Sequence, residues 1–237
     1  MQCVHLHKFF VHMQFMIRIH PNDKLVLRDP EDTQLGRNIV RQGLILMHKL
    51  GFEHFTFKKL ADEMHTTEAS IYRYFENKHR LLLYILNWYW NFLEYLVVFS
   101  LHNLHSSEEK IQTVINLLVR QLPEGMDSSG LDKKALYEIV IAESSKTYLT
   151  REVSQINQGQ LFKPYKDLCA RIADLFIEYN PDYKYPHSLA STLIEMAHLQ
   201  YYFMQNLPRL TDFVADKDEA QIVDFLNNLV FSSIRKS

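Results

Sequence analysis

Cysteine, glycine and proline are scarce in this sequence of 237 residues. It contains two cysteines, Cys3 and Cys169, and no Cys-x-x-Cys pair, so neither a disulfide framework nor a zinc ribbon is indicated. This cysteine usage fits a reducing cytoplasm. Six glycines and seven prolines are too few for an all-β fold, which needs many turns. We therefore expect an all-α protein.

Fingerprints of several enzyme classes are also missing. The sequence has no Gly-x-Ser-x-Gly motif, no phosphate-binding loop and no dinucleotide-binding fingerprint. Its start, MQCVHLHKFFVHMQFMIRI, lacks the unbroken apolar core and the small-residue cleavage site of a signal peptide. We expect a cytoplasmic protein that is not an enzyme and binds no cofactor.

Charge is nearly balanced overall but unevenly placed. The formal net charge is −2, which excludes a basic nucleic-acid coat. Between Thr33 and Arg80, eight Lys or Arg stand against five Asp or Glu, a formal charge of +3. The remainder is acidic as a result. A mildly basic head on an acidic body suits a protein that touches DNA at one end.

The stretch from Thr56 to Arg80, TFKKLADEMHTTEASIYRYFENKHR, predicts a helix-turn-helix. Its first helix begins at the N-cap Thr56 and carries one apolar face, formed by Phe57, Leu60, Ala61 and Met64. A second helix is predicted over Glu68–Tyr74, and Asn77 caps a third. A helix of seven residues is not stable alone, because nucleation is costly and few hydrogen bonds close. Its neighbours must hold it in place.

The free face of the second helix is polar, aromatic and small, which fits the major groove of DNA. Glu68, Ala69 and Ser70 are expected to face base edges, where Glu68 can accept from a cytosine amino group. The residues expected to bind phosphates are Thr56, Lys58, Tyr72, Tyr74 and Lys78, and Arg73 can bind either phosphate or base. Thr67, which can cap the helix, completes the predicted surface. An ordinary helical hairpin is the alternative interpretation.

The pattern is specific when its parts are taken together. It consists of Gly51-Phe52, Phe55-Thr56, Lys59-Leu60-Ala61, the run from Thr67 to Phe75, and Asn77-Lys78. Over about residues 36 to 85, the chain resembles the DNA-binding domain of the tetracycline-repressor (TetR) family. Family members often have Gly or Pro where Ala69 stands and a hydrophobic residue where Thr66 stands, so the packing of the turn differs from the usual pattern.

The resemblance implies a sequence-specific transcriptional regulator, a ligand-responsive repressor. It divides the chain into a partly disordered arm (1–32), a helix-turn-helix domain (33–80), and a helical effector-binding and dimerisation domain (81–237). It also implies that the last two helices meet their twins in a homodimer. A dimer is independently expected, because one short helix contacts too few base pairs, whereas two copies read a palindromic operator.

Two helices flank the motif. One is predicted from Gln34 to Leu50, with Gly51 ending it in a left-handed position. The other lies within residues 81–104, the most hydrophobic part of the chain, yet Asn87, Asn91 and Glu94 interrupt it. Polar groups at mid-span argue against a transmembrane helix, so we expect a core helix and no membrane partner.

Aromatic residues of this core helix are candidates for an effector pocket. Trp88, Tyr89, Trp90, Phe92 and Tyr95 are all candidates to line a pocket, and Trp88, Phe92 and Tyr95 are the predicted effector-binding residues. Aromatics at helical spacing are more often ordinary core. Further helices are predicted over 107–122, 131–145, 147–159, 164–179, 187–206 and 216–234. The last two carry broad apolar faces: Leu189, Leu193, Met196, Ala197, Tyr201 and Met204 in one, and Ile222, Phe225, Leu226, Leu229 and Val230 in the other.

An all-helical di-metal carboxylate enzyme is the competing hypothesis. Glu195-x-x-His198 and Glu76-x-x-His79 have the spacing that di-iron helical bundles use. Such pairs arise easily by chance in a chain with twelve histidines, and the second pair falls at the exit of the helix-turn-helix. We therefore predict no metal site and no catalytic residue.

Overall fold

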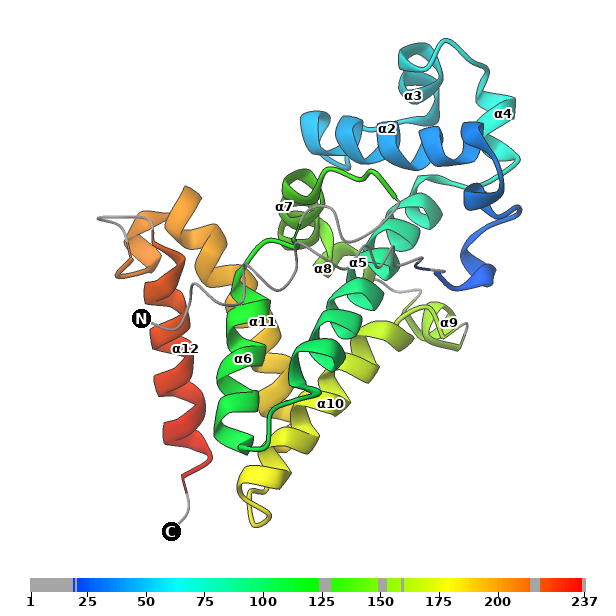
Figure 1. Ribbon diagram of the computed structural model, residues 1–237. Coiled ribbons are helices and arrows are strands. Elements are labelled where there is room, and N and C mark those ends of the chain that lie inside the picture. The colour runs from blue at the N-terminus through cyan, green and yellow to red at the C-terminus, as the bar shows by residue number, and fades with distance from the viewer. Residues whose placement is uncertain are drawn as a thin grey trace.

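The computed structural model describes residues 19, 21–123, 129–148, 153–158, 160–213 and 218–235. Within these ranges, every regular element is an α-helix or a short 3₁₀ helix, which confirms the predicted all-α fold. Figure 1 shows a small head that contains α2, α3 and α4 and a larger helical body, with α5 leading from the head into the body.

Three helices form the head: α2 (Gln34–Leu50), α3 (Phe57–Glu63) and α4 (Glu68–Tyr72). Each begins after a threonine whose side-chain oxygen accepts an amide hydrogen three residues ahead, namely Thr33, Thr56 and Thr67. These caps satisfy amides that the first helical turn leaves free. The bounds of α2 are those predicted, and Gly51 follows it with a positive φ of 75°, a conformation that favours glycine.

Two 3₁₀ helices, η2 (Asp23–Leu25) and η3 (Pro30–Asp32), precede α2 and pack onto the head. η2 contacts α5, and η3 contacts α2. The amide of Leu27 donates to the carbonyl of Tyr74 at 2.8 Å. This segment therefore packs as part of the head, whereas the sequence suggested an arm over residues 1–32. The first eighteen residues of that arm lie outside the described ranges.

The longest helix, α5 (Lys78–Leu101), begins at the predicted cap: Asn77 Oδ1 accepts from the amide of Arg80 at 3.0 Å. In the described part of the chain, α5 is the one helix long and apolar enough to cross a membrane. However, 78% of its most apolar 18-residue window is buried inside the protein. Such burial is that of a core helix, as predicted.

The body surrounds α5 with further helices. They are α6 (Ser107–Val119), α7 (Lys133–Glu143), α8 (Ser145–Tyr148), α9 (Val153–Gln158), α10 (Lys163–Tyr179), α11 (Pro186–Asn206), η4 (Pro208–Leu210) and α12 (Glu219–Ser233). α10 packs against α5, α6 and α11, while α12 packs against α6 and α11. α12 lies on the side of the body away from the head (Figure 1). The stretch predicted as one frayed helix over 147–159 falls instead into two short pieces, α8 and α9.

The apolar faces of α11 and α12 are used mostly within the chain. Their buried members are Leu189, Leu193, Ala197 and Met204 in α11, and Ile222, Leu226 and Val230 in α12. The large apolar side chains that these two helices expose are Leu199, Tyr202 and Phe225, each 36–37% exposed. The predicted faces therefore stabilise the body first, and only Phe225 among them belongs to the exposed group.

Two glycines of α2 pack closely against neighbouring segments, one against backbone atoms and the other against a side chain. A Cβ at Gly36 would lie 2.3 Å from the backbone carbonyl oxygen of Pro30. A Cβ at Gly43 would lie 2.9 Å from a side-chain methyl group of Leu81, which can rotate away. The close approach at Gly36 fixes η3 against the start of α2.

We predict that Gly36→Ala destabilises the protein by about 1–3 kcal/mol, because the added methyl meets backbone that cannot move aside. Gly43→Ala is the matched control in the same helix, where the helix propensity of alanine offsets the side-chain shift by up to about 1 kcal/mol. Urea unfolding measures both variants. Equal stabilities, or a more stable Gly36→Ala, would contradict the packing described.

Candidate DNA-binding surface and effector cavity

The second helix of the motif is shorter than predicted. α4 ends at Tyr72, two residues early, and so has five residues rather than seven. Its anchor is Ile71, which is fully buried. Glu68 and Ala69 are exposed and Ser70 is partly exposed. All three residues predicted to face bases are thus accessible, while a single aliphatic side chain ties their helix to the core.

Backbone geometry fixes the turn between α3 and α4. His65 has a φ of +51°, and the amide of Thr66 donates to the carbonyl of Ala61 at 2.9 Å. The Thr67 hydroxyl then accepts from the amide of Ser70 at 3.3 Å and lies 3.0 Å from its hydroxyl. Thr67 therefore caps α4 and positions Ser70, so it has a structural role in addition to its place on the exposed surface.

Four of the residues predicted to bind phosphate are accessible around α4. Thr56, Lys58 and Arg73 are exposed, and Tyr72 is 47% exposed. The ring of Tyr72 packs edge-on against Phe57 at a centroid distance of 5.1 Å, and this contact holds the partly exposed side chain in place. These positions are compatible with contacts to a DNA backbone on both sides of α4.

Two predicted phosphate contacts are corrected by the structure. Tyr74 is 2% exposed, and its hydroxyl lies 2.7 Å from the Thr33 hydroxyl, inside the head. Lys78 Nζ donates to three backbone carbonyls, those of Phe52 at 2.9 Å, Glu53 at 3.1 Å and Phe55 at 3.2 Å. An ammonium group has three donors, so Lys78 is fully occupied. Both side chains hold the head together instead of reaching outward.

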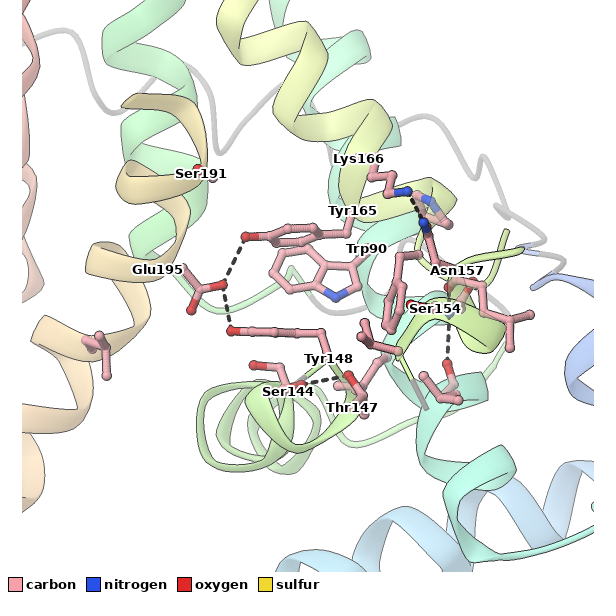
Figure 2. Close-up of a pocket in the computed structure, with 18 residues that line it drawn as sticks. Trp90, Ser144, Thr147, Tyr148, Ser154, Asn157, Tyr165, Lys166, Ser191 and Glu195 are labelled. Atoms are coloured by element: carbon pink, nitrogen blue, oxygen red, sulfur yellow. Dashed lines mark hydrogen bonds between the residues drawn. The ribbon is translucent and has the colours of Figure 1, made fainter. Parts of the chain in front are cut away.

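The body contains a cavity of about 710 Å³, bordered by α5, α8, α9, α10 and α11 (Figure 2). This volume lies within the range of small-molecule sites. Its walls are mostly hydrocarbon and aromatic, with contributions from Leu83, Leu86, Trp90, Leu161, Phe162 and Leu199. A few polar groups interrupt this lining, and they are the features that can orient a ligand.

One carboxylate stands in the cavity wall. Tyr148 and Tyr165 both donate their hydroxyl hydrogens to Glu195 Oε1, at 3.0 and 2.9 Å (Figure 2). Burial raises the pKa of both tyrosines well above its usual value, and the nearby carboxylate adds to that increase. Burial also raises the pKa of the adjacent Cys169 thiol to about 11. The phenols therefore stay protonated and remain donors to Glu195.

Asn87 forms a second polar point in the wall. It is 2% exposed, and its Nδ2 donates to the carbonyls of Leu83 at 3.0 Å and Leu161 at 2.7 Å. Its Oδ1 is buried without a hydrogen-bond partner among the residues described. The sequence placed Asn87 on a polar stripe with Asn91 and Glu94, and the structure shows that the first member of this stripe lines the cavity.

Of the five aromatic residues considered for the pocket, Trp90 lines this cavity, whereas Trp88, Tyr89, Phe92 and Tyr95 do not. Trp88 and Phe92 stack on each other at 5.1 Å, and Lys133 Nζ lies 4.4 Å from the Trp88 ring centroid. Tyr95 is 36% exposed near the far end of α5. Among the aromatics of α5, the lining residue is Trp90. The other lining residues come from helices far apart in the chain, and no local pattern marks them.

The Glu-x-x-His pair of α11 is divided between two environments. Glu195 faces the cavity, whereas His198 is 4% exposed and packs among aromatic rings, with Nε2 3.4 Å from the Tyr89 hydroxyl. Burial lowers the pKa of His198 to about 4, so the ring is neutral. Over the described ranges, no three His, Cys, Asp or Glu side chains gather where they could hold a metal ion. The di-metal enzyme hypothesis is not supported.

α7 and α8 connect the cavity to the head. α7 packs against α2, as Figure 1 shows below the head. Lys146 of α8 places its Nζ 2.7 Å from Oε2 of Glu143, the last residue of α7, and 3.2 Å from Glu53 Oε1 of the head. The next residues, Thr147 and Tyr148, line the cavity. One short segment thus touches both candidate sites.

Residues 39–85 match the family described as bacterial regulatory proteins, tetR family. No curated protein has a sequence that matches the chain significantly. Three solved structures are similar in fold, each at 16% identity. AibR in complex with isovaleryl coenzyme A and operator DNA gives a TM-score of 0.58, covering 83% of this chain and 99% of its own.

The fatty acid degradation regulator FadR from Bacillus halodurans gives a TM-score of 0.59, covering 86% of this chain and 98% of its own. A transcriptional regulator of the TetR/AcrR family from Thermobifida fusca YX-ER1 gives 0.52, covering 84% and 97%. The likeness thus extends through head and body. Residues 39–85 thus match the tetR family of bacterial regulatory proteins, and the chain as a whole is similar in fold to these regulators.

Proposed function

We propose that the protein is a sequence-specific DNA-binding transcriptional regulator, a homodimeric repressor that reads a palindromic operator and responds to a small molecule in the cavity. The observation that carries this proposal is the accessible face of α4. Glu68, Ala69 and Ser70 are accessible on this helix, and Lys58, Tyr72 and Arg73 are exposed within the same helix-turn-helix. Short polar side chains can meet base edges, and the flanking groups can bind phosphates.

The dimer would form through α11 and α12. Leu199, Tyr202 and Phe225 are large apolar side chains on these helices that remain more than a third exposed. Burying them against a second copy offers a favourable apolar contact. Two copies would present two α4 helices to successive half-sites, which is what a two-fold operator requires.

Occupation of the cavity would change the position of the head. The ligand can shift such a balance only by binding one arrangement more tightly than the other. α8 lines the cavity, and the bridge from Glu143 through Lys146 to Glu53 joins the end of α7 to the head. A ligand that displaces α8 would therefore alter the support of the loop before α3. AibR is described with both a ligand and operator DNA, and we carry over that combination alone.

Repression would follow from occlusion of a promoter by the bound dimer. Because its partner is chromosomal DNA in this proposal, we assign the protein to the cytoplasm. The fold already shown is that of DNA-binding regulators, and the most apolar helix is buried inside it.

Random-oligonucleotide selection with the purified protein tests the proposal. We expect a palindromic consensus whose half-sites lie about one helical turn of DNA apart or a multiple of it. On the selected duplex, Lys58→Ala should flatten the salt dependence of binding by roughly 0.9 in slope for each phosphate that the protein no longer neutralises. The reason is that each neutralised phosphate releases a condensed counterion.

Lys184→Ala is the control, because this exposed lysine lies in the loop before α11, outside the head. Its slope should match that of the wild type. The proposal is wrong if the selection yields no consensus, or if the protein binds no duplex at low salt.

We predict that Lys146→Met loosens the contact between head and body. The substitution removes the Lys146 ammonium from Glu143, whose side chain is only 9% exposed. Glu143 then retains one hydrogen bond, which the backbone amide of Phe52 donates to its Oε1 at 3.4 Å. Because Lys146 is half-exposed, losing its charged hydrogen bond to Glu143 should weaken the contact between head and body by about 1–2 kcal/mol. Amide exchange at residues 52–56 should accelerate roughly 5- to 30-fold.

Hydrogen–deuterium exchange with mass spectrometry measures this effect. Lys110→Met, which breaks the Lys110–Glu178 pair between α6 and α10, is the matched control and should leave the 52–56 segment unchanged. Equal exchange at 52–56 in both variants would show that the bridge does not support the head.

A further inference from the structure

The cavity combines apolar walls with a carboxylate that has no cationic partner among the described residues. Glu195 accepts from two neutral phenols, both at Oε1. Lys166, a cation of the cavity wall, donates to Asn157 and not to Glu195. A negative charge beside hydrocarbon is destabilised unless it is paired or fully hydrogen-bonded. Two phenols compensate one oxygen of the carboxylate and leave its charge unneutralised.

A second unsatisfied group in the wall has the same polarity. Asn87 Oδ1 is a buried acceptor without a partner in the described part of the chain. Leaving such a group unpaired is unfavourable. Its amide nitrogen is already used by two carbonyls, so the side chain cannot turn its donor to the cavity without losing both bonds. The atom that Asn87 leaves unpaired is therefore a buried acceptor.

The aromatic part of the wall favours positive charge as well. Trp90 and Tyr165 meet edge-to-face at 4.9 Å, and both line the cavity with Tyr148. Indole and phenol faces attract cations through the ring quadrupole. The carboxylate, the amide oxygen and the aromatic faces thus all favour a positively charged ligand, and the hydrocarbon walls favour a ligand with a large apolar part.

We propose that the effector of this cavity is a lipophilic cation with hydrogen-bond donors, of the class of alkyl or aryl amines. Its ammonium group pairs with Glu195 and its N–H groups satisfy acceptors of the wall, while its hydrocarbon part fills the apolar remainder. An anionic ligand of the same shape meets like charge at Glu195 and finds no donor at Asn87. This inference rests on the proposed function, because it names the ligand class of the regulatory cavity.

Four probes with one ten-carbon chain test the assignment: decylamine, decyltrimethylammonium, decanol and decanoate. Near pH 7 the amine is protonated, as a lysine side chain is, and the carboxylate is ionised. Calorimetry below the micellar concentrations measures their affinities for the full-length protein. We expect decylamine to bind about 10- to 100-fold more tightly than decanoate, with decanol between them. Decyltrimethylammonium, which has charge but no donor, should fall below decylamine and above decanol.

Glu195→Gln should bring decylamine close to decanol and leave decanol binding unchanged, since the hydrocarbon walls stay intact. Glu109→Gln, an exposed position at the start of α6, is the matched control and should keep the wild-type order. Decanoate binding as tightly as decylamine, or an unchanged amine preference in Glu195→Gln, would overturn the assignment.

Binding of each ligand-free variant to the selected duplex is measured in parallel. A wild-type protein that binds the duplex but shows no preference for the amine would overturn the ligand class alone. A protein that selects amines but binds no duplex would overturn the regulatory role and leave the ligand class standing.

Discussion

A helix of five residues closes too few hydrogen bonds to persist by itself, and this constraint shapes the whole head. α4 is held from the inside by Ile71 and from its start by the Thr67 hydroxyl. Tyr74 and Lys78, just beyond it, turn inward and tie the chain to Thr33 and to the loop before α3. Because these inward contacts hold the helix, the outward side chains of Glu68 and Ala69 are not needed for packing and are accessible to a partner such as DNA.

The predictions that were right concern local features of the chain. Helix bounds followed from caps and breakers, because a threonine, an asparagine or a glycine acts within three residues of its own position. α2 and the start of α5 were predicted for that reason. The predicted phosphate contacts of Tyr74 and Lys78 were wrong. The sequence beside a recognition helix does not indicate whether a tyrosine or lysine side chain points outward or inward. Its direction depends on partners more than twenty residues earlier, namely Thr33 for Tyr74 and the carbonyls of the loop at residues 51–56 for Lys78.

The cavity shows where local reasoning ends. Trp88 and Phe92 attracted attention because they are aromatic and one turn apart, yet that spacing places them together against α7. The polar residues that characterise the cavity are Asn87, Tyr148, Tyr165 and Glu195, from four different helices. Only the packing of these helices brings them together, and neither composition nor periodicity encodes that packing. The segment over 147–159 gave a weak signal, since its poor periodicity reflects two short pieces beside the cavity.

In the proposed function, α4 can bind DNA only while its buried anchor holds it in an outward position. Ile71→Ala tests it most directly, since Ile71 is fully buried and cannot itself touch DNA. Removing such a side chain costs about 2–5 kcal/mol locally. The affinity of this variant for the selected duplex should fall by at least about tenfold, while circular dichroism shows the body helices still folded. Wild-type affinity in a folded Ile71→Ala protein would contradict the account.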